Sequence, residues 1–213
     1  MSRKPDSAPL LIACALGIEH LALCSGDRTG ADGPVTLLRT GMGPRAAERS
    51  VLRALADPAH AGAAVLATGF CAGLAPGMHP GDLVVAEEAR NPRGTTACVR
   101  SDLLVKELAR CLPGRMVHTG PLTGSDHVVR GQERSELFAT GAIAVDMESA
   151  ATLHSAVRTG PRPVAAVRVV VDAPEHELVR IGTLRGGISA FRVLRAILPA
   201  FFEWHRSLLL PRR

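Results

Sequence analysis

The chain has 213 residues, of which 46% are hydrophobic, 21% are charged and 3% are aromatic, and its formal net charge is +5. This length favours one globular domain, and the balance of apolar and charged residues excludes a disordered chain. The few aromatic residues and the lack of tyrosine argue against a base-stacking surface, so we expect no nucleic-acid partner.

The first predicted element is a buried strand over residues 9–16. Its continuous apolar run is typical of a strand that is covered on both faces. Arg3 and Lys4 ahead of it mimic a secretory signal, but Asp6 interrupts the start and no cleavage site follows, so we favour a core strand. Glu19 lies just beyond the carboxyl end, either as a solvated acid of a first helical turn or as a site residue.

Two glycine-containing turns follow in the first half of the chain. The pattern predicts a strand over residues 35–38 and a helix over 44–56, with Gly43 in the turn between them. It also predicts a buried strand over 63–68 that ends in a glycine-rich turn at 69–74. Such turns let backbone amides approach an anion or a hydroxyl, although a simple tight turn explains them equally well.

The middle of the chain predicts four further elements. They are a strand over residues 83–86, an amphipathic helix over 101–111, a strand over 116–121 and a short helix over 132–139. Strands alternate with helices here and no linker or long repeat is present. The pattern therefore predicts one α/β domain spanning residues 1–213, a three-layer sandwich around a mixed central sheet.

An apolar run at residues 142–145 ends abruptly in Asp146 and Glu148, and a helix is predicted from 147 to about 157. In an open α/β sheet, ligands bind beyond the carboxyl ends of the strands, so both carboxylates are candidates for a polar ligand. The alternative is that Asp146 caps the helix and that the helix dipole favours Glu148.

The strongest strand signal lies at residues 164–171 and ends in Asp172. A carboxylate in this place is either an acid poised by partial burial or a residue of the turn that ends the strand.

A final amphipathic helix is predicted over about residues 188–210. It carries seven large apolar residues, Phe191, Leu194, Ile197, Leu198, Phe201, Phe202 and Trp204, beside three arginines. It either packs on the core or on a second subunit, or it lies on a membrane surface. No apolar run reaches the length of about 18 residues that a membrane span requires.

Four segments together resemble the nucleoside phosphorylase and nucleosidase superfamily, which includes methylthioadenosine/S-adenosylhomocysteine nucleosidase. They are Gly-Phe-Cys-Ala-Gly-Leu at 69–74, Gly-Asp-Leu-Val-Val at 81–85, Val-Asp-Met-Glu-Ser-Ala at 145–150 and Arg-Val-Val-Val-Asp at 168–172. The resemblance covers roughly residues 9–175 and implies the nucleoside phosphorylase-like fold. The short chain, residues 168–178 and the basic apolar tail are most similar to the hopanoid-associated branch, whose members are thought to remove adenine from adenosylhopane.

The resemblance implies roles for nine residues. Glu148 resembles the glutamate that accepts hydrogen bonds from both ribose hydroxyls, and Met147 the residue that packs on the sugar. Asp172 resembles the general acid that protonates purine N7, and Glu19 the glutamate that activates water. The other expected substrate contacts are Gly43, Gly69, Phe70, Val128 and Val129.

This chemistry needs an acid for the leaving group and a nucleophile on the opposite face, because glycosidic cleavage passes through an oxocarbenium-like state. It needs no metal or redox cofactor, although phosphate becomes the co-substrate if the enzyme is a phosphorylase. The five cysteines are widely spaced and form no Cys-x-x-Cys pair, which indicates free thiols in a cytoplasmic protein and no zinc site.

The chain departs from the superfamily pattern in several places. Phosphorylases carry an arginine near the position of Ala67 and an early Gly-Asp-Pro-x-Arg loop, and this chain has neither. Phosphate would have to be held otherwise, for example by Gly43 and Arg45, so we favour water as the nucleophile. The usual Ser-Asp-x-Ala-Asp is Val-Asp-Ala-Pro-Glu at 171–175. The stacking aromatic expected near Val128 is missing, and Phe70 would substitute for it.

The sequence therefore predicts cleavage of the N-glycosidic bond of a purine nucleoside, with adenosylhopane in hopanoid biosynthesis as the expected substrate. Two alternatives stay open: a phosphate-dependent phosphorylase for a soluble nucleoside, and a non-catalytic nucleoside-binding protein of the same fold. We expect a small-molecule or lipid-linked nucleoside as the ligand, a homodimer, and a cytoplasmic location with peripheral contact to the inner membrane. A dinucleotide-dependent reductase is disfavoured, because no Gly-x-Gly-x-x-Gly follows the first strand.

Overall fold

A computed structural model describes residues 8–173 and 182–209, and within these ranges eight strands alternate with seven α-helices. The strands are β1 Leu10–Cys14, β2 Val35–Arg39, β3 Ala64–Gly73, β4 Leu83–Asn91, β5 Gly94–Ala97, β6 Val117–Gly124, β7 Ala144–Asp146 and β8 Val164–Asp172. The helices are α1 Gly17–Cys24, α2 Pro44–Leu55, α3 Ser101–Cys111, α4 Gln132–Ala139, α5 Ser149–Arg158, α6 Gly182–Ala196 and α7 Leu198–Leu208, with a short 3₁₀ helix at Pro58–His60.

The strands form one mixed sheet, part of which closes on itself. Along one path the order is β2-β1-β3-β7-β6-β4-β5, and β8 pairs with both β3 and β4. β8 runs parallel to β3 and antiparallel to β4, whereas β7 runs antiparallel to β3 and parallel to β6. The pairings of β3, β8, β4, β6 and β7 therefore form a ring. The predicted α/β domain with a mixed sheet is confirmed.

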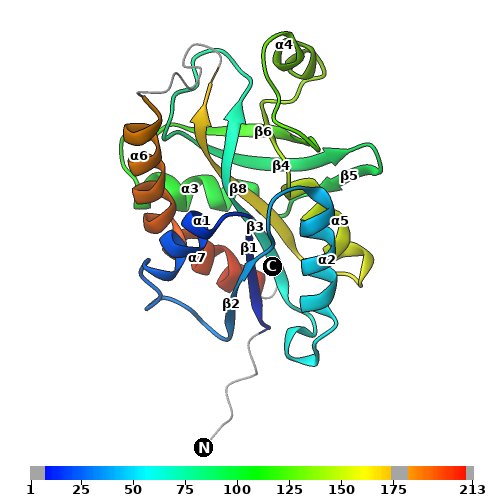
Figure 1. Ribbon diagram of the computed structural model, residues 1–213. Helices are drawn as coiled ribbons and strands as arrows, with labels where there is room; N and C mark the ends of the chain where they lie inside the picture. Colours follow the sequence, from blue (N-terminus) through cyan, green and yellow to red (C-terminus); the bar gives the residue numbers. More distant parts are fainter. Residues whose placement is uncertain (1–7, 174–181, 210–213) are drawn as a thin grey trace, which may run out of the picture.

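Helices cover both faces of the sheet (Figure 1). Helices α2 and α5 lie over one core, and α1, α3, α6 and α7 lie over a second, larger core. In β1, Leu10 and Ile12 belong to the larger core and Leu11 to the other. Burial on both faces explains why this strand is a continuous apolar run in the sequence. Helix α4 stands apart from both layers at the top of Figure 1.

Three elements in the first half differ from the sequence predictions. Helix α1, of which only a first turn at Glu19 was considered, begins three residues after the end of β1 and buries Ala22 and Leu23. β3 continues to Gly73, so the turn predicted from residue 69 is wrong. These residues instead pair with β8, from Gly69 beside Arg168 onward, and this pairing outweighs the preference of glycine for turns. β4 likewise continues to Asn91 and forms an antiparallel hairpin with β5.

The predicted C-terminal helix is two helices, α6 and α7, which meet at Ile197. Pro199 lies in the first turn of α7, where it lacks an N–H and cannot continue α6. Phe201, Phe202 and Trp204 are at most 2% exposed, so α7 packs into the larger core. Residue 210, the predicted end, lies outside the described residues. Within the described ranges, no helix is both long and apolar enough to span a bilayer.

Candidate active site

A cavity of about 250 Å³ lies beside the second half of β3. Phe70, Cys71 and Ala72 of β3 line it, together with the ends of β7 and β8 and with residues that follow β1 and β7. Seven of the nine predicted site residues line this one cavity: Glu19, Phe70, Val128, Val129, Met147, Glu148 and Asp172. The structure therefore brings together residues that are up to 153 positions apart, because Glu19 and Asp172 both reach the same strand.

The direction of β7 differs from the expectation for an open α/β sheet, in which Glu148 would lie beyond the same carboxyl edge of the sheet as Glu19 and Asp172. β7 runs antiparallel to β3, with Val145 beside Ala72, so Glu148 approaches the cavity from the opposite direction to Asp172. β3 extends past the end of β1, and its residues 70–72 line the cavity between Glu148 on one side and Asp172 on the other.

Glu19 is 2% exposed, so its interpretation as a solvated acid is wrong. Its Oε2 accepts hydrogen bonds from the amides of Ala15 and Leu16 at 2.9 and 2.8 Å. Its Oε1 accepts one from the amide of Phe70 at 2.7 Å. The carboxylate thus satisfies the start of α1 and at the same time ties that helix to β3 beside the cavity.

Gly69 lies against this carboxylate and has a φ of +129°. A Cβ at this position would lie 2.5 Å from Glu19 Oε1 and 2.7 Å from Arg168 Nη1. Glycine therefore permits both the backbone conformation and the close approach of Glu19 and Arg168. Gly69 supports the cavity from behind and does not line it.

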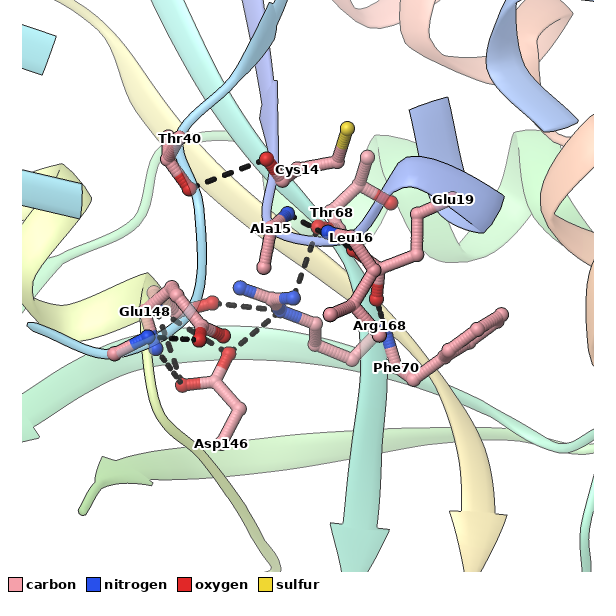
Figure 2. A network of polar contacts seen from close by, with 12 residues as sticks. Cys14, Ala15, Leu16, Glu19, Thr40, Thr68, Phe70, Asp146, Glu148 and Arg168 are labelled. Carbon is pink, nitrogen blue, oxygen red and sulfur yellow. Dashed lines mark hydrogen bonds and ion pairs between the residues drawn. The ribbon is translucent and has the colours of Figure 1, made fainter. Parts of the chain in front are cut away.

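Arg168 of β8 is the cation at the centre of this region, as Figure 2 shows. It is 1% exposed, and its Nε lies 2.6 Å from Asp146 Oδ2 and 2.8 Å from Ser149 Oγ. Its Nη1 donates to the carbonyl of Thr68 at 2.8 Å. Burial lowers the pKa of Arg168, but the three carboxylates of Asp146, Glu148 and Glu19 raise it by more, so the net shift is upward.

Glu148 is 7% exposed, and its Oε1 accepts a hydrogen bond from the amide of Gly43 at 2.7 Å. Burial raises the pKa of Glu148, and the charges of Asp146 and Glu19 raise it further, against Arg168 and the Gly43 amide. Gly43, predicted to contact substrate, thus positions the carboxylate with its own N–H. Glu148 lines the cavity, and its other oxygen, Oε2, accepts no hydrogen bond from the described residues.

Asp146 serves the beginning of α5. Its carboxylate accepts from the amides of Glu148 and Ser149 at 3.1–3.3 Å, besides its ion pair with Arg168. This agrees with the interpretation of Asp146 as a helix-capping residue.

Asp172, at the end of β8, forms an ion pair with Arg134 of α4. The side chains are 16% and 6% exposed. Oδ1 of Asp172 and Nη1 of Arg134 are buried and have no hydrogen-bond partner among the described residues. Leaving a buried polar group unsatisfied costs about 1–3 kcal/mol. Two such atoms in one ion pair are therefore characteristic of a site that a ligand completes. The altered segment after Asp172 includes Pro174 and Glu175, which lie outside the described residues.

A second cavity, of about 420 Å³, adjoins the first. Met147 and His127 line both cavities. Arg45, the other residue considered for phosphate, lines the second cavity only, on the far side of Met147 from Glu19 and Asp172.

Sequence reasoning missed the parts that Arg134 and Arg168 play. Arg168 interrupts the apolar run of β8, and an arginine inside a buried strand is a signal of a buried carboxylate partner. Arg134 lies on a short polar helix, where nothing in the local pattern distinguishes it from a solvated arginine.

The cavity combines three carboxyl groups with different surroundings. Glu19 is fixed by three amides, whereas Glu148 and Asp172 each have one oxygen without a hydrogen-bond partner in the part of the chain that the structure describes. Such a wall can accept hydrogen bonds from vicinal hydroxyls, stabilise a developing positive charge and exchange a proton with a bound base.

A family model described as the phosphorylase superfamily matches residues 28–199. No curated protein sequence matches the chain. Among solved structures, the 5′-methylthioadenosine/S-adenosylhomocysteine nucleosidase of Neisseria meningitidis in complex with methylthio-immucillin-A superposes with a TM-score of 0.76. It is 19% identical, and 92% of this chain and 99% of that chain are covered.

Two further nucleosidase structures are similar. The S-adenosylhomocysteine nucleosidase of Streptococcus pyogenes in complex with 5-methylthiotubericidin has a TM-score of 0.76 and 20% identity, covering 99% of this chain and 100% of that chain. The nucleosidase of Helicobacter pylori has a TM-score of 0.72 and 15% identity, covering 95% and 99%. At these identities the likeness establishes the fold, and the predicted nucleoside phosphorylase-like fold is confirmed.

Proposed function

Since the chain belongs to the phosphorylase superfamily, we propose that it hydrolyses the N-glycosidic bond of a purine nucleoside and releases the free base. The observation that carries this proposal is the presence of Glu148, Asp172 and Glu19 in the wall of one cavity. In this proposal they serve as a hydrogen-bond acceptor for the ribose, an acid for the leaving base and a base for the attacking water.

In this mechanism, the free oxygen of Glu148 accepts hydrogen bonds from the ribose hydroxyls while Met147 packs on the sugar. Asp172 in its protonated form gives its proton to purine N7, so the base leaves as a neutral molecule. Glu19 accepts a proton from the attacking water. The negative charges of Glu19 and Glu148 stabilise the positive charge that develops on the ribose.

Three observations favour water over phosphate as the nucleophile. The Gly43 amide is engaged by Glu148, and Arg45 lines the neighbouring cavity. Ala67, where phosphorylases place an arginine, is a 1% exposed core residue. Neither residue considered for phosphate is therefore free at the site. We propose that the enzyme needs no cofactor.

For the substrate we propose an adenine nucleoside with an apolar 5′ substituent, and adenosylhopane as the candidate in hopanoid biosynthesis. Support comes from the mouth of the cavity, where Met42 and Val128 are 66% and 61% exposed although both line it. An apolar mouth suits a lipid-linked nucleoside better than a fully polar one. We further propose a cytoplasmic homodimer that contacts the inner membrane peripherally to reach such a substrate.

The test is incubation of the purified protein with adenosine, methylthioadenosine and adenosylhopane, with and without phosphate. We expect free adenine and the free sugar in the absence of phosphate. Asp172→Asn should lower kcat about 10²–10⁴-fold, whereas the control Asp102→Asn, at an exposed position of α3, should not. No base release from any of these substrates by the wild type would contradict the proposal, and strict phosphate dependence would make the enzyme a phosphorylase.

A second candidate function is nucleoside binding without turnover. The segment Val-Asp-Ala-Pro-Glu at 171–175 favours it, because it replaces the usual Ser-Asp-x-Ala-Asp and so changes the residues that would support Asp172 as an acid. Tight nucleoside binding that survives Asp172→Asn, with no base release by the wild type, would support this candidate.

A further inference from the structure

Arg134 is the second member of the buried pair that holds Asp172. It comes from α4, the helix that stands apart from both layers (Figure 1), and its side chain lines the same cavity as Asp172. The guanidinium contacts Oδ2 of Asp172 through Nη2, and Nε donates to the carbonyl of Val129 at 3.4 Å. Val129 itself lines the cavity in the predicted base-binding segment.

We propose that Arg134 is a positioning residue, which holds Oδ2 of Asp172 so that the catalytic proton resides on Oδ1. The inference rests on the proposed function, because it concerns the acid of that reaction. It goes beyond it by assigning a role to a residue of α4 and by naming the oxygen that acts on the base.

The two oxygens of Asp172 are not equivalent. Oδ2 accepts from the Arg134 guanidinium, which has donors only. A proton on Oδ2 would place an O–H beside that N–H donor and would remove the acceptor that the guanidinium uses. Oδ1 has no partner among the described residues, so it is the oxygen on which a proton meets no competing donor.

Arg134 also connects the acid to the segment that is expected to hold the base. Its Nε contact with Val129 and its Nη2 contact with Asp172 span the cavity wall from one to the other. Arg134 therefore links the position of the Asp172 carboxyl group to that of Val129. A guanidinium suits this task, because its planar fork fixes direction as well as charge.

A pair with only a structural purpose would satisfy both side chains. Arg168, the other buried arginine of the site, donates to Ser149, to the Thr68 carbonyl and to the Asp146 carboxylate. Within the described ranges, Arg134 and Asp172 instead each have one buried atom without a hydrogen-bond partner, Nη1 and Oδ1. This incomplete pairing is the reason for assigning Arg134 to the reaction and not to the fold alone.

The test is a double-mutant cycle with Arg134→Gln and Asp172→Asn, measured on the adenine nucleoside that the wild type hydrolyses best. We expect Arg134→Gln to lower kcat about 10²-fold with KM changed less than about threefold, because only the transition state uses the acid. In the double variant kcat should equal that of Asp172→Asn, since Arg134 acts through Asp172. Arg134→Lys should recover part of kcat, and the exposed Arg130→Gln, outside the cavity, is the matched control.

A substrate whose leaving group needs no proton supplies the second readout. Release of p-nitrophenolate from p-nitrophenyl β-ribofuranoside should fall less than about threefold in Arg134→Gln, because the acid contributes little there. Full additivity in the cycle, or equal losses on both substrates, would overturn the inference. If Arg134→Gln does not fold, the same comparisons with Arg134→Lys decide. A wild type without base release refutes the proposed function itself, whereas an active wild type with a fully active Arg134→Gln refutes only this inference.

Discussion

At the scale of single residues, Glu148 is the position at which stability and ligand binding conflict. The ribose needs the ionised carboxylate, which accepts hydrogen bonds from two hydroxyls. Burial raises the pKa of Glu148, as do Asp146 and Glu19, against the opposing effects of Arg168 and the Gly43 amide. The folded protein therefore favours the protonated form more than the unfolded chain does. The contribution of protonated Glu148 to the free energy of unfolding is therefore present at low pH. It is lost as the pH rises through the pKa that Glu148 has in the folded protein.

We accordingly expect Glu148→Gln to be as stable as the wild type at pH 7, or more stable, while KM for a nucleoside rises about 10- to 100-fold. The glutamine keeps an oxygen for the Gly43 amide and removes a buried charge. Urea unfolding at pH 7 and pH 4 measures the first effect, and the difference between the two proteins should shrink at the lower pH. Nucleoside affinity of the wild type should fall as the pH drops through the raised pKa. A variant that is clearly less stable at pH 7 would show that the anion supports the fold.

Gly69 is a residue that both its backbone conformation and its close contacts make necessary. Gly69→Ala should destabilise the protein by about 2–4 kcal/mol, from the strained φ and from the displacement of Glu19 and Arg168. Gly94→Ala is the matched control, because its φ is +139° and nothing lies within 4 Å of the added Cβ. Denaturant unfolding of both variants separates the contact from the backbone strain. Equal losses of stability would mean that Gly69 is there for conformation alone.

At the scale of elements, Arg168 joins four of them. From β8 it reaches the end of β7 through Asp146, the start of α5 through Ser149, and β3 through the Thr68 carbonyl. These contacts fix the approach of Glu148, which sits between β7 and α5. The active-site geometry is therefore a property of how these elements meet.

Arg168→Met should destabilise the fold by about 3–5 kcal/mol, because it leaves Asp146 and its neighbours as uncompensated buried charges. Arg90→Met is the comparison, since its ion pair with Glu88 is about one-third exposed and should contribute under about 1 kcal/mol. Thermal and urea unfolding report both values. Similar, small losses in the two variants would indicate that the buried pair is not required by the fold.

At the scale of the whole molecule, burial divides the five cysteines, all of which are free. Burial raises the pKa of Cys14 to about 12, with Glu19 as the next cause, and burial also raises the pKa of Cys98 to about 12. Burial raises the pKa of Cys71 as well, with a further contribution from Asp146. Cys24 is exposed on α1.

Since the thiolate is the reactive form, the native protein should react with a thiol reagent at neutral pH through one fast cysteine, Cys24. Unfolding in urea should release all five. Cys24→Ser should abolish the fast phase, which mass spectrometry of the alkylated protein can verify. Rapid labelling of Cys14 or Cys71 in the folded protein would contradict the burial of these two side chains.

The sequence by itself determined the fold class and seven of the residues that line the cavity. Continuous apolar runs such as residues 9–16 indicate strands with two covered faces, and the structure has β1 between two cores. Glu148 follows the end of β7 by two residues and Asp172 is the last residue of β8, so local pattern made both of them candidates. It left a structural interpretation of each residue open, and the resemblance selected them. The resemblance also selected Glu19, Met147 and Phe70, because it compares whole motifs and not isolated positions.

The tertiary structure alone decided what surrounds those residues. The long β3, the ring of pairings and the reversed β7 follow from contacts between segments that are distant in the sequence, which local preferences for turns or strands do not encode. The partners of the carboxylates were decided in the same way: Arg168 reaches Asp146, and Arg134 reaches Asp172. An ion pair depends on distance and burial in three dimensions, and both exist only once the chain has folded.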